Sequence, residues 1–199
     1  MNNFLVIDNW YNKKELSSVY KELDFLHLKI MESGDPVNAA TDENGISKIK
    51  AHRISPYTLY SDEGMRYSPI LKSIKKFQDK DFHKEIEKTF KNTNTALYEQ
   101  FISTNHSSTI INYYENNDSY REHFDVFQFT ILIFIYKKPK AFSGGDLKFN
   151  RIKKTVECKN NRLVLFPSFY YHEITPIKSE TKKKGFGRYS ISNFLSCRS

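Results

Sequence analysis

The chain has 199 residues, of which 39% are apolar and 27% charged, a composition typical of a folded globular protein and not of a disordered one. No apolar run approaches the roughly 20 residues that a membrane-spanning helix needs, and the first residues, MNNFLVIDNW, lack the pattern of a secretory signal. Cys158 and Cys197 lie far apart and in no metal-ligand spacing, which favours reduced thiols. We therefore expect one cytoplasmic domain with no membrane association.

The net charge is +8, and the lysines gather in several clusters along the chain. A surface of this kind attracts polyanions through non-specific forces that weaken as salt is added. Lysine-rich loops and helix faces in contact with water explain the same charge. Charge alone therefore predicts solubility and weak association, and no particular partner.

The first third of the chain predicts a strand, a helix and a long connection. Residues 4–8 have the composition of a short strand, and Asn12 is a suitable N-cap for a helix through about Leu26. Residues 31–66 contain several turn signals and two prolines. A connection of this length is typical of a lid or of a loop that faces the substrate, although an inert surface excursion is the equal alternative.

Helical spacing of apolar residues returns over residues 69–101, in two pieces divided near 78–81. From residue 106 onward the pattern changes to strands separated by turn signals. We expect strands near 108–115, 126–136, 145–149, 152–158, 162–166, 170–176 and 186–195. The fold class is therefore α+β and mainly β, a single domain over 1–199 with helical support over about 1–105 and a cupin-like jelly-roll core over about 106–196.

The chemistry of the chain is concentrated in a His-x-Asp pair, His123 and Asp125, followed 47 residues later by His172. Side chains at i and i+2 of an extended segment point the same way, so an imidazole and a carboxylate can lie side by side. Two histidines and one carboxylate form the facial triad of non-heme Fe(II) oxygenases, and the absence of a nearby thiolate argues against structural zinc. Taken singly, each residue is more simply explained by a surface His beside an Asp or by a core His bound to a carbonyl.

The segment GFGRYSISNFL, residues 185–195, supplies a second group of polar side chains. Strand alternation places Arg188, Ser190 and Ser192 on one face. An arginine that points inward among apolar residues needs an anionic partner, and its planar fork is suited to a carboxylate. Strand orientation alone leaves an outward, solvated arginine open.

Taken together, these segments resemble the 2-oxoglutarate- and Fe(II)-dependent oxygenases, and within them the prolyl-4-hydroxylase-like group. The resemblance covers about residues 108–195 and is carried by HFD at 123–125, SGGDL at 143–147, LFPSFYYHEITPI at 165–177 and GRYSIS at 187–192. It implies a double-stranded β-helix core and a dioxygenase that uses Fe(II), 2-oxoglutarate and O2, with ascorbate as a supporting reductant.

The resemblance also implies roles for individual residues. His123, Asp125 and His172 would hold the iron, and Arg188 would bind the C5 carboxylate of 2-oxoglutarate with the help of Ser190. Family members often carry a co-substrate-contacting tyrosine ten residues before the first histidine, which matches Tyr113; Tyr120 would form pocket wall. Two features depart from the family: Tyr114-Glu115 replaces the usual Pro-Gly, and an arginine stands where collagen-type members use lysine.

For the substrate, the 31–66 segment offers Arg53 and Tyr57 as pocket residues. The leading hypothesis is a hydroxylase that acts on a protein or peptide residue or on a free amino acid. Oxidative demethylation of nucleic acid is an alternative that the basic charge favours, but AlkB-like demethylases carry a second arginine where this chain has Phe194. A catalytically silent jelly roll that binds a small-molecule or protein partner is the third.

Overall fold

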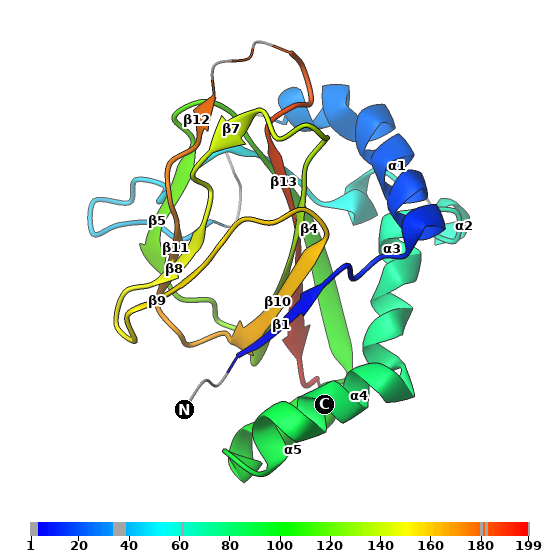
Figure 1. Ribbon diagram of the computed structural model, residues 1–199, viewed down its shortest axis with the longest axis vertical. Helices are drawn as coiled ribbons and strands as arrows, with labels where there is room; N and C mark the ends of the chain where they lie inside the picture. Colours follow the sequence, from blue (N-terminus) through cyan, green and yellow to red (C-terminus); the bar gives the residue numbers. More distant parts are fainter. Residues whose placement is uncertain (1–3, 34–38, 61, 180, 182, 199) are drawn as a thin grey trace.

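A computed structural model describes residues 4–33, 39–60, 62–179, 181 and 183–198. Two antiparallel sheets face each other, and the helices cover the outer face of the larger sheet (Figure 1). The larger sheet has six strands in the order β1-β10-β6-β13-β4-β3, the smaller has five in the order β2-β5-β11-β8-β9, and β12 pairs with β7. Among the described residues, no helix is long and apolar enough to cross a membrane.

The strands of the larger sheet are β1 (Leu5–Asp8), β10 (Arg162–Pro167), β6 (Phe129–Ile135), β13 (Arg188–Ser196), β4 (His106–Tyr114) and β3 (His52–Ile54). Those of the smaller sheet are β2 (Ile49–Lys50), β5 (Ser119–His123), β11 (His172–Ile174), β8 (Leu147–Phe149) and β9 (Lys154–Val156); the remaining pair is β7 (Phe142–Ser143) and β12 (Lys178–Ser179). The helical elements are α1 (Lys13–Met31), η1 (Pro56–Thr58), α2 (Asp62–Met65), α3 (Pro69–Ser73), η2 (Ile74–Gln78), α4 (Lys80–Ile86), the π-helical η3 (Glu87–Lys91) and α5 (Thr95–Ile102).

Strand alternation in the larger sheet builds two separate apolar cores. On β6, Ile131 and Ile133 pack toward the helices, whereas Leu132 and Phe134 pack between the two sheets. Every residue of β6 is buried, as expected for a strand covered on both faces. The predicted jelly-roll core with supporting helices is therefore confirmed, and the space between the sheets is where a site can form.

The predicted N-cap is also confirmed, and it starts a longer helix than expected. The side chain of Asn12 accepts hydrogen bonds from the amides of Lys14 and Glu15, and the Glu15 carboxylate accepts one from the Asn12 amide in return. Helix α1 continues to Met31 because the buried stripe extends past Leu26 to Ile30.

Three predictions of local structure were wrong. The 31–66 segment contains β2, β3, η1 and α2 and is not wholly loop; its residues 34–38 and 61 lie outside the described residues. The 69–101 region has a second break before α5, and residues 119–123, for which no strand was expected, form β5. β2, β3 and β5 are short and partly polar, so pairing with neighbouring strands stabilises them and local pattern does not reveal them.

A buried carboxylate ties α1 to the segment that leads into α3. Glu22 accepts hydrogen bonds from the hydroxyl of Tyr60 at 2.8 Å, the amide of Ile70 at 2.7 Å and the hydroxyl of Ser68. Burial and the neighbouring carboxylate raise the pKa of Tyr60, which keeps this phenol a donor. The polar cluster fixes how the helical layer sits against the sheet.

We expect Glu22→Ala to lower the free energy of unfolding by about 2–4 kcal/mol, because three donors lose their charged acceptor. Urea denaturation monitored by circular dichroism measures this loss of unfolding free energy. Glu32→Ala, at the exposed C-terminal end of the same helix, is the matched control and should change the stability by less than about 0.5 kcal/mol. Equal effects of the two changes would contradict the role given to Glu22.

Candidate metal centre

The two predicted histidine ligands lie opposite each other on neighbouring strands. β5 pairs with β11 in a register that sets His172 against His123, and a bulge follows before Ile174 meets Tyr120. The two imidazole centroids are 4.3 Å apart. Both rings are buried between the sheets, so a separation of 47 residues in the sequence becomes a direct cross-strand contact.

Backbone carbonyls fix the tautomer of both rings. Nδ1 of His123 lies 2.9 Å from the carbonyl oxygen of Arg121, and Nδ1 of His172 lies 2.8 Å from that of Tyr170. A carbonyl only accepts, so each Nδ1 carries the proton and each Nε2 keeps its lone pair. Burial, assisted by the neighbouring imidazole of His172, lowers the pKa of His123 to about 2. His123 is therefore neutral, as a metal ligand must be.

Asp125 completes the group from the loop that leads into β6. Its Oδ1 lies 3.8 Å from Nε2 of His123, and its Oδ2 lies 3.7 Å from Nε2 of His172. Each of the three side chains offers one donor atom that lies within 4.8 Å of the donor atoms of the other two. Among the residues that the structure describes, this is the one cluster of at least three His, Cys, Asp or Glu side chains with such geometry.

The three side chains open into one cavity between the sheets. Its wall is formed by Arg53, Asn112, Tyr114, Tyr120, His123, Asp125, Leu132, His172, Ile174, Ser190, Ser192 and Phe194. The predicted alternation on β13 is confirmed, since Ser190 and Ser192 face this cavity while Tyr189 and Ile191 join the helix-side core. The metal-binding group and the polar face of β13 therefore share one space.

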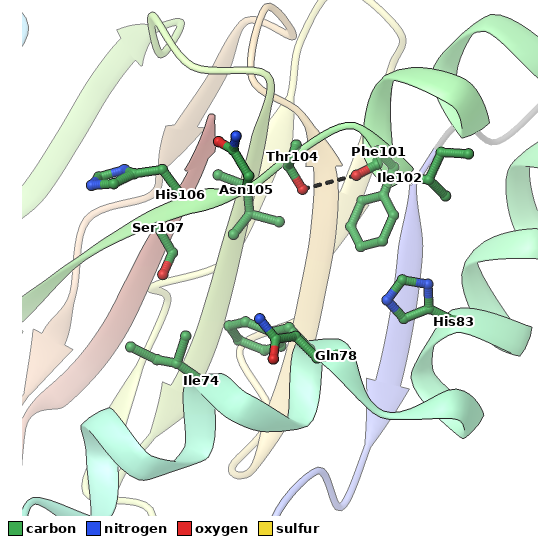
Figure 2. Close-up of a pocket in the computed structure, with 11 residues that line it drawn as sticks. Ile74, Gln78, His83, Phe101, Ile102, Thr104, Asn105, His106 and Ser107 are labelled. Carbon is green, nitrogen blue, oxygen red and sulfur yellow. Dashed lines mark hydrogen bonds between the residues drawn. The ribbon is translucent and has the colours of Figure 1, made fainter. Parts of the chain in front are cut away.

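A second pocket lies on the helix side of the larger sheet and has different chemistry (Figure 2). Its wall combines apolar side chains such as Ile74 and Phe101 with scattered polar ones. His83 and His106 lie at opposite ends of it in Figure 2 and do not converge on a common point. This pocket has no carboxylate in its wall and lacks the donor set found between the sheets.

Arg188 is completely buried, with 0% of its surface exposed, and its guanidinium lies 4.9 Å from the ring centre of Tyr114 and 4.7 Å from that of Phe134. Among the described residues, none of its three side-chain nitrogens has a hydrogen-bond partner. Leaving a buried cation without an anion costs several kcal/mol, so the site is built for an anionic group that the folded chain does not itself supply. A carboxylate fits the planar fork of the guanidinium.

Glycine makes room for this side chain. Gly145 has a φ of +75°, and a Cβ atom there would come within 2.8 Å of the Arg188 Cδ and 2.4 Å of the Ile177 Cδ1. The SGGDL turn thus closes directly over the arginine.

The structure places Tyr113, the tyrosine predicted to contact the co-substrate, outside the wall of the cavity. Its hydroxyl accepts a hydrogen bond from the Gly187 amide at 3.0 Å, and its ring packs against His27 on the helix side of the sheet. The next residue, Tyr114, pairs with Arg188 across β4 and β13 and lines the cavity. Because successive strand residues point to opposite faces, counting back from His123 gave the wrong parity.

Tyr114 is therefore the tyrosine beside the arginine, and burial raises its pKa to about 12. Its hydroxyl remains protonated and can donate to an anion bound at Arg188. The sequence did contain a signal for Tyr114, because the side chains of Arg188 and Tyr114 must point to the same face of the sheet if the two residues are cross-strand neighbours. That signal depended on the β4–β13 register, which pattern alone does not give.

The other predicted pocket residues divide into two groups. Tyr120 stacks on His123 with 3.6 Å between ring centres, and the Arg53 guanidinium lies 5.8 Å from the Tyr120 ring while its Nε donates to Asn112 at 2.8 Å. Both line the cavity. Tyr57, in η1, is not part of its wall and is partly exposed. The structure therefore does not bring Tyr57 together with the other predicted pocket residues.

The donor set fits a first-row divalent metal that keeps open positions: two neutral imidazoles and one carboxylate are hard enough for Fe(II). The unpaired guanidinium of Arg188, the Tyr114 hydroxyl and Ser190 fit one end of a dicarboxylate. Ser190 lies two residues along β13 from Arg188, about 7 Å at the rise of a strand.

Comparison with known proteins agrees with this geometry. Residues 109–196 match the sequence model of the family described as the 2OG-Fe(II) oxygenase superfamily. No curated protein matches the chain. Similar solved structures include a Pseudomonas putida prolyl-4-hydroxylase, with a TM-score of 0.64 at 14% identity over 100% of this chain and 95% of that one.

Two further structures share the fold. A Trichoplax adhaerens prolyl hydroxylase, solved in complex with a peptide fragment of a hypoxia inducible factor oxygen degradation domain, has a TM-score of 0.62 at 17% identity, over 99% of this chain and 84% of that one. An oxidoreductase of the 2OG-Fe(II) oxygenase family from Burkholderia pseudomallei has a TM-score of 0.58 at 15% identity, over 99% and 86%. Residues 109–196 therefore resemble the 2OG-Fe(II) oxygenase superfamily, and the chain as a whole has the fold of these prolyl hydroxylases.

Proposed function

We propose that this protein is a 2-oxoglutarate-dependent dioxygenase that hydroxylates a C–H bond in a protein or peptide substrate, with iron held by His123, Asp125 and His172 and with 2-oxoglutarate held by Arg188. The observation that carries the proposal is the unpaired, buried guanidinium beside a cavity that also contains the three metal-binding side chains. The three metal-binding side chains are suited to a metal ion, and the guanidinium needs an anion. Fe(II) and 2-oxoglutarate, the two ligands of a 2-oxoglutarate oxygenase, meet both requirements. When bound, they supply the oxidation of a C–H bond by O2, coupled to conversion of 2-oxoglutarate into succinate and CO2.

The protein groups have separate tasks in this proposal. The two imidazoles present Nε2 because their Nδ1 protons are engaged by carbonyls, so the metal meets preoriented ligands. Arg188 neutralises the distal carboxylate of the co-substrate, and Tyr114 and Ser190 line the path to it. Leu132, Ile174 and Phe194 give the cavity apolar walls that limit the access of water.

The substrate side of the cavity is a wider groove that begins at Asp125. It is lined by Ala39, Ala40, Arg53, Ser55, Ser108, Thr109, Ile110, Tyr120, Phe124, Asp125, Val126, Phe127 and Phe194. Phe124 is 46% exposed and Val126 is 84% exposed, on either side of the metal-binding aspartate. Exposed apolar side chains around an active site indicate a binding surface for a larger partner.

Two features favour a polypeptide over a free amino acid. The groove extends past the metal centre, so there is room for residues that flank the one oxidised. The Trichoplax prolyl hydroxylase with the same fold was solved with a peptide fragment bound. Apart from the metal-binding Asp125, the charged residue in this groove is Arg53, which favours substrates that are apolar or carry a negative group.

A direct test is to incubate an extract of the source cells with the protein, Fe(II), 2-oxoglutarate and air, and to search tryptic peptides for a gain of one oxygen atom. The His123→Ala variant serves as the inactive control. Sites modified by the wild type alone support the proposal. Oxygen gained only on free amino acids or on nucleic acid would assign a different substrate class.

For the metal group, we expect His123→Ala to abolish measurable Fe(II) binding, because two remaining ligands hold the ion weakly. Anaerobic titration of the protein with Fe(II) in the presence of 2-oxoglutarate, followed by calorimetry, measures the loss. His83→Ala and His106→Ala in the pocket of Figure 2 are matched controls that should bind iron like the wild type. Iron binding that survives in His123→Ala would overturn the assignment.

For the co-substrate group, we expect Arg188→Met to weaken the affinity for 2-oxoglutarate at least 100-fold while the metal still binds. The same change should raise the stability of the ligand-free protein by about 1–4 kcal/mol, since a buried unpaired cation is removed at similar volume. Thermal unfolding shows both effects: the co-substrate stabilises the wild type by about 2.7 kcal/mol at 100 times its Kd, and the variant should not respond. A normal response of Arg188→Met to 2-oxoglutarate would refute this role.

For the groove, we expect Val126→Asp to reduce peptide oxidation about tenfold or more, because a charge in the apolar rim opposes docking. Co-substrate binding should stay unchanged, since Val126 lies outside the inner cavity. Ile152→Asp, at another exposed apolar position, is the control and should leave product formation intact. The groove is not the substrate site if the two variants oxidise peptides equally.

A further inference from the structure

Behind the metal-binding carboxylate lies a short chain of buried hydroxyl groups. The Thr130 Oγ1 lies 2.6 Å from the Asp125 Oδ2 and 2.9 Å from the Ser168 Oγ. Thr130 and Ser168 both have 0% of their surface exposed. Thr130 occupies the face of β6 on which Leu132 and Phe134 pack between the sheets, so a hydroxyl at this place interrupts an otherwise apolar row.

The direction of the chain follows from counting protons. A carboxylate only accepts, so Thr130 must donate its single proton to Asp125. Ser168 must then be the donor to the Thr130 oxygen, because Thr130 has no second proton to give. The order is therefore Ser168 to Thr130 to Asp125, and each bond polarises the next in a space that water does not reach.

The backbone reinforces the same link. The Asp125 amide donates to the Ser168 carbonyl at 2.9 Å, and the Ser168 amide donates to the Gln128 carbonyl at 3.0 Å. The loop between β5 and β6 is thus fastened to Ser168, just past the end of β10, at the aspartate and again three residues after it. Without these contacts, Asp125 would lie in a loop that is not held by strand pairing.

We propose that Thr130, supported by Ser168, is a positioning residue that orients the Asp125 carboxylate for the metal. The hydrogen bond to Oδ2 restrains rotation of the carboxylate and occupies one of its lone pairs, so the group meets the ion in a single prepared orientation. Such partners of metal ligands typically affect metal affinity 10- to 100-fold when removed. The inference rests on the proposed metal centre and extends it to a residue that does not touch the metal.

The test is a set of Mn(II) affinities, measured from the electron paramagnetic resonance signal of free Mn(II), with and without 2-oxoglutarate. Thr130→Val keeps the shape of the side chain and removes the hydroxyl; we expect its affinity for Mn(II) to fall about 10- to 100-fold. Thr130→Ser keeps the hydroxyl and should stay within about threefold of the wild type. Ser168→Ala removes only the outer hydroxyl, and its affinity for Mn(II) should lie between those of Thr130→Val and Thr130→Ser.

Circular dichroism and urea denaturation of each ligand-free variant show whether the fold is kept. Rescue by Thr130→Ser with loss in Thr130→Val supports the positioning role, because mere packing would be preserved by valine. If Thr130→Val fails to fold, the Ser168→Ala variant tests the inference instead. An affinity for Mn(II) equal to that of the wild type in Ser168→Ala would then overturn it. Wild-type affinity in a folded Thr130→Val also overturns the inference, whereas a wild-type protein that binds no Mn(II) overturns the proposed function itself.

Discussion

The register between β5 and β11 is the constraint on which the site depends, because it sets His172 directly against His123. A slip of one residue would turn one imidazole to the opposite face of the sheet and separate the two nitrogen ligands. The register is maintained by the apolar residues of the smaller sheet, among them Tyr120 and Ile174, which bury their side chains in the core between the sheets. Packing in that core therefore determines the geometry of the metal-binding group.

The second ligand group depends on the larger sheet in the same way. β13 lies between β6 and β4, and its pairing with β4 aligns Arg188 with Tyr114. A buried guanidinium without an anion is unfavourable for folding, yet the strand that carries it is surrounded by two apolar cores that stabilise it. Stability contributed by the cores thus offsets the cost of burying this cation without a partner.

Much of this arrangement could be predicted from the sequence, and the failures have a common physical cause. Long, strongly patterned elements such as β6 and α1 were evident from local residues, and the alternation along β13 correctly put Ser190 on the cavity face. What could not be predicted depended on contacts between distant segments: the short strands β2, β3 and β5, and the parity that separates Tyr114 from Tyr113. Thr130 escaped notice because a single threonine in an apolar strand carries no pattern, and its role exists only through its contacts with Asp125 and Ser168.

We expect one cavity between the sheets to hold a metal at one end and a dicarboxylate at the other. A crystal structure of the protein with Mn(II), as a stand-in that does not react with O2, and 2-oxoglutarate tests it most directly. Mn(II) should lie on Nε2 of His123, Nε2 of His172 and the Asp125 carboxylate, with the distal carboxylate of 2-oxoglutarate on the guanidinium of Arg188. Mn(II) bound elsewhere, or an Arg188 that stays without an anion while 2-oxoglutarate is bound at another place, would contradict it.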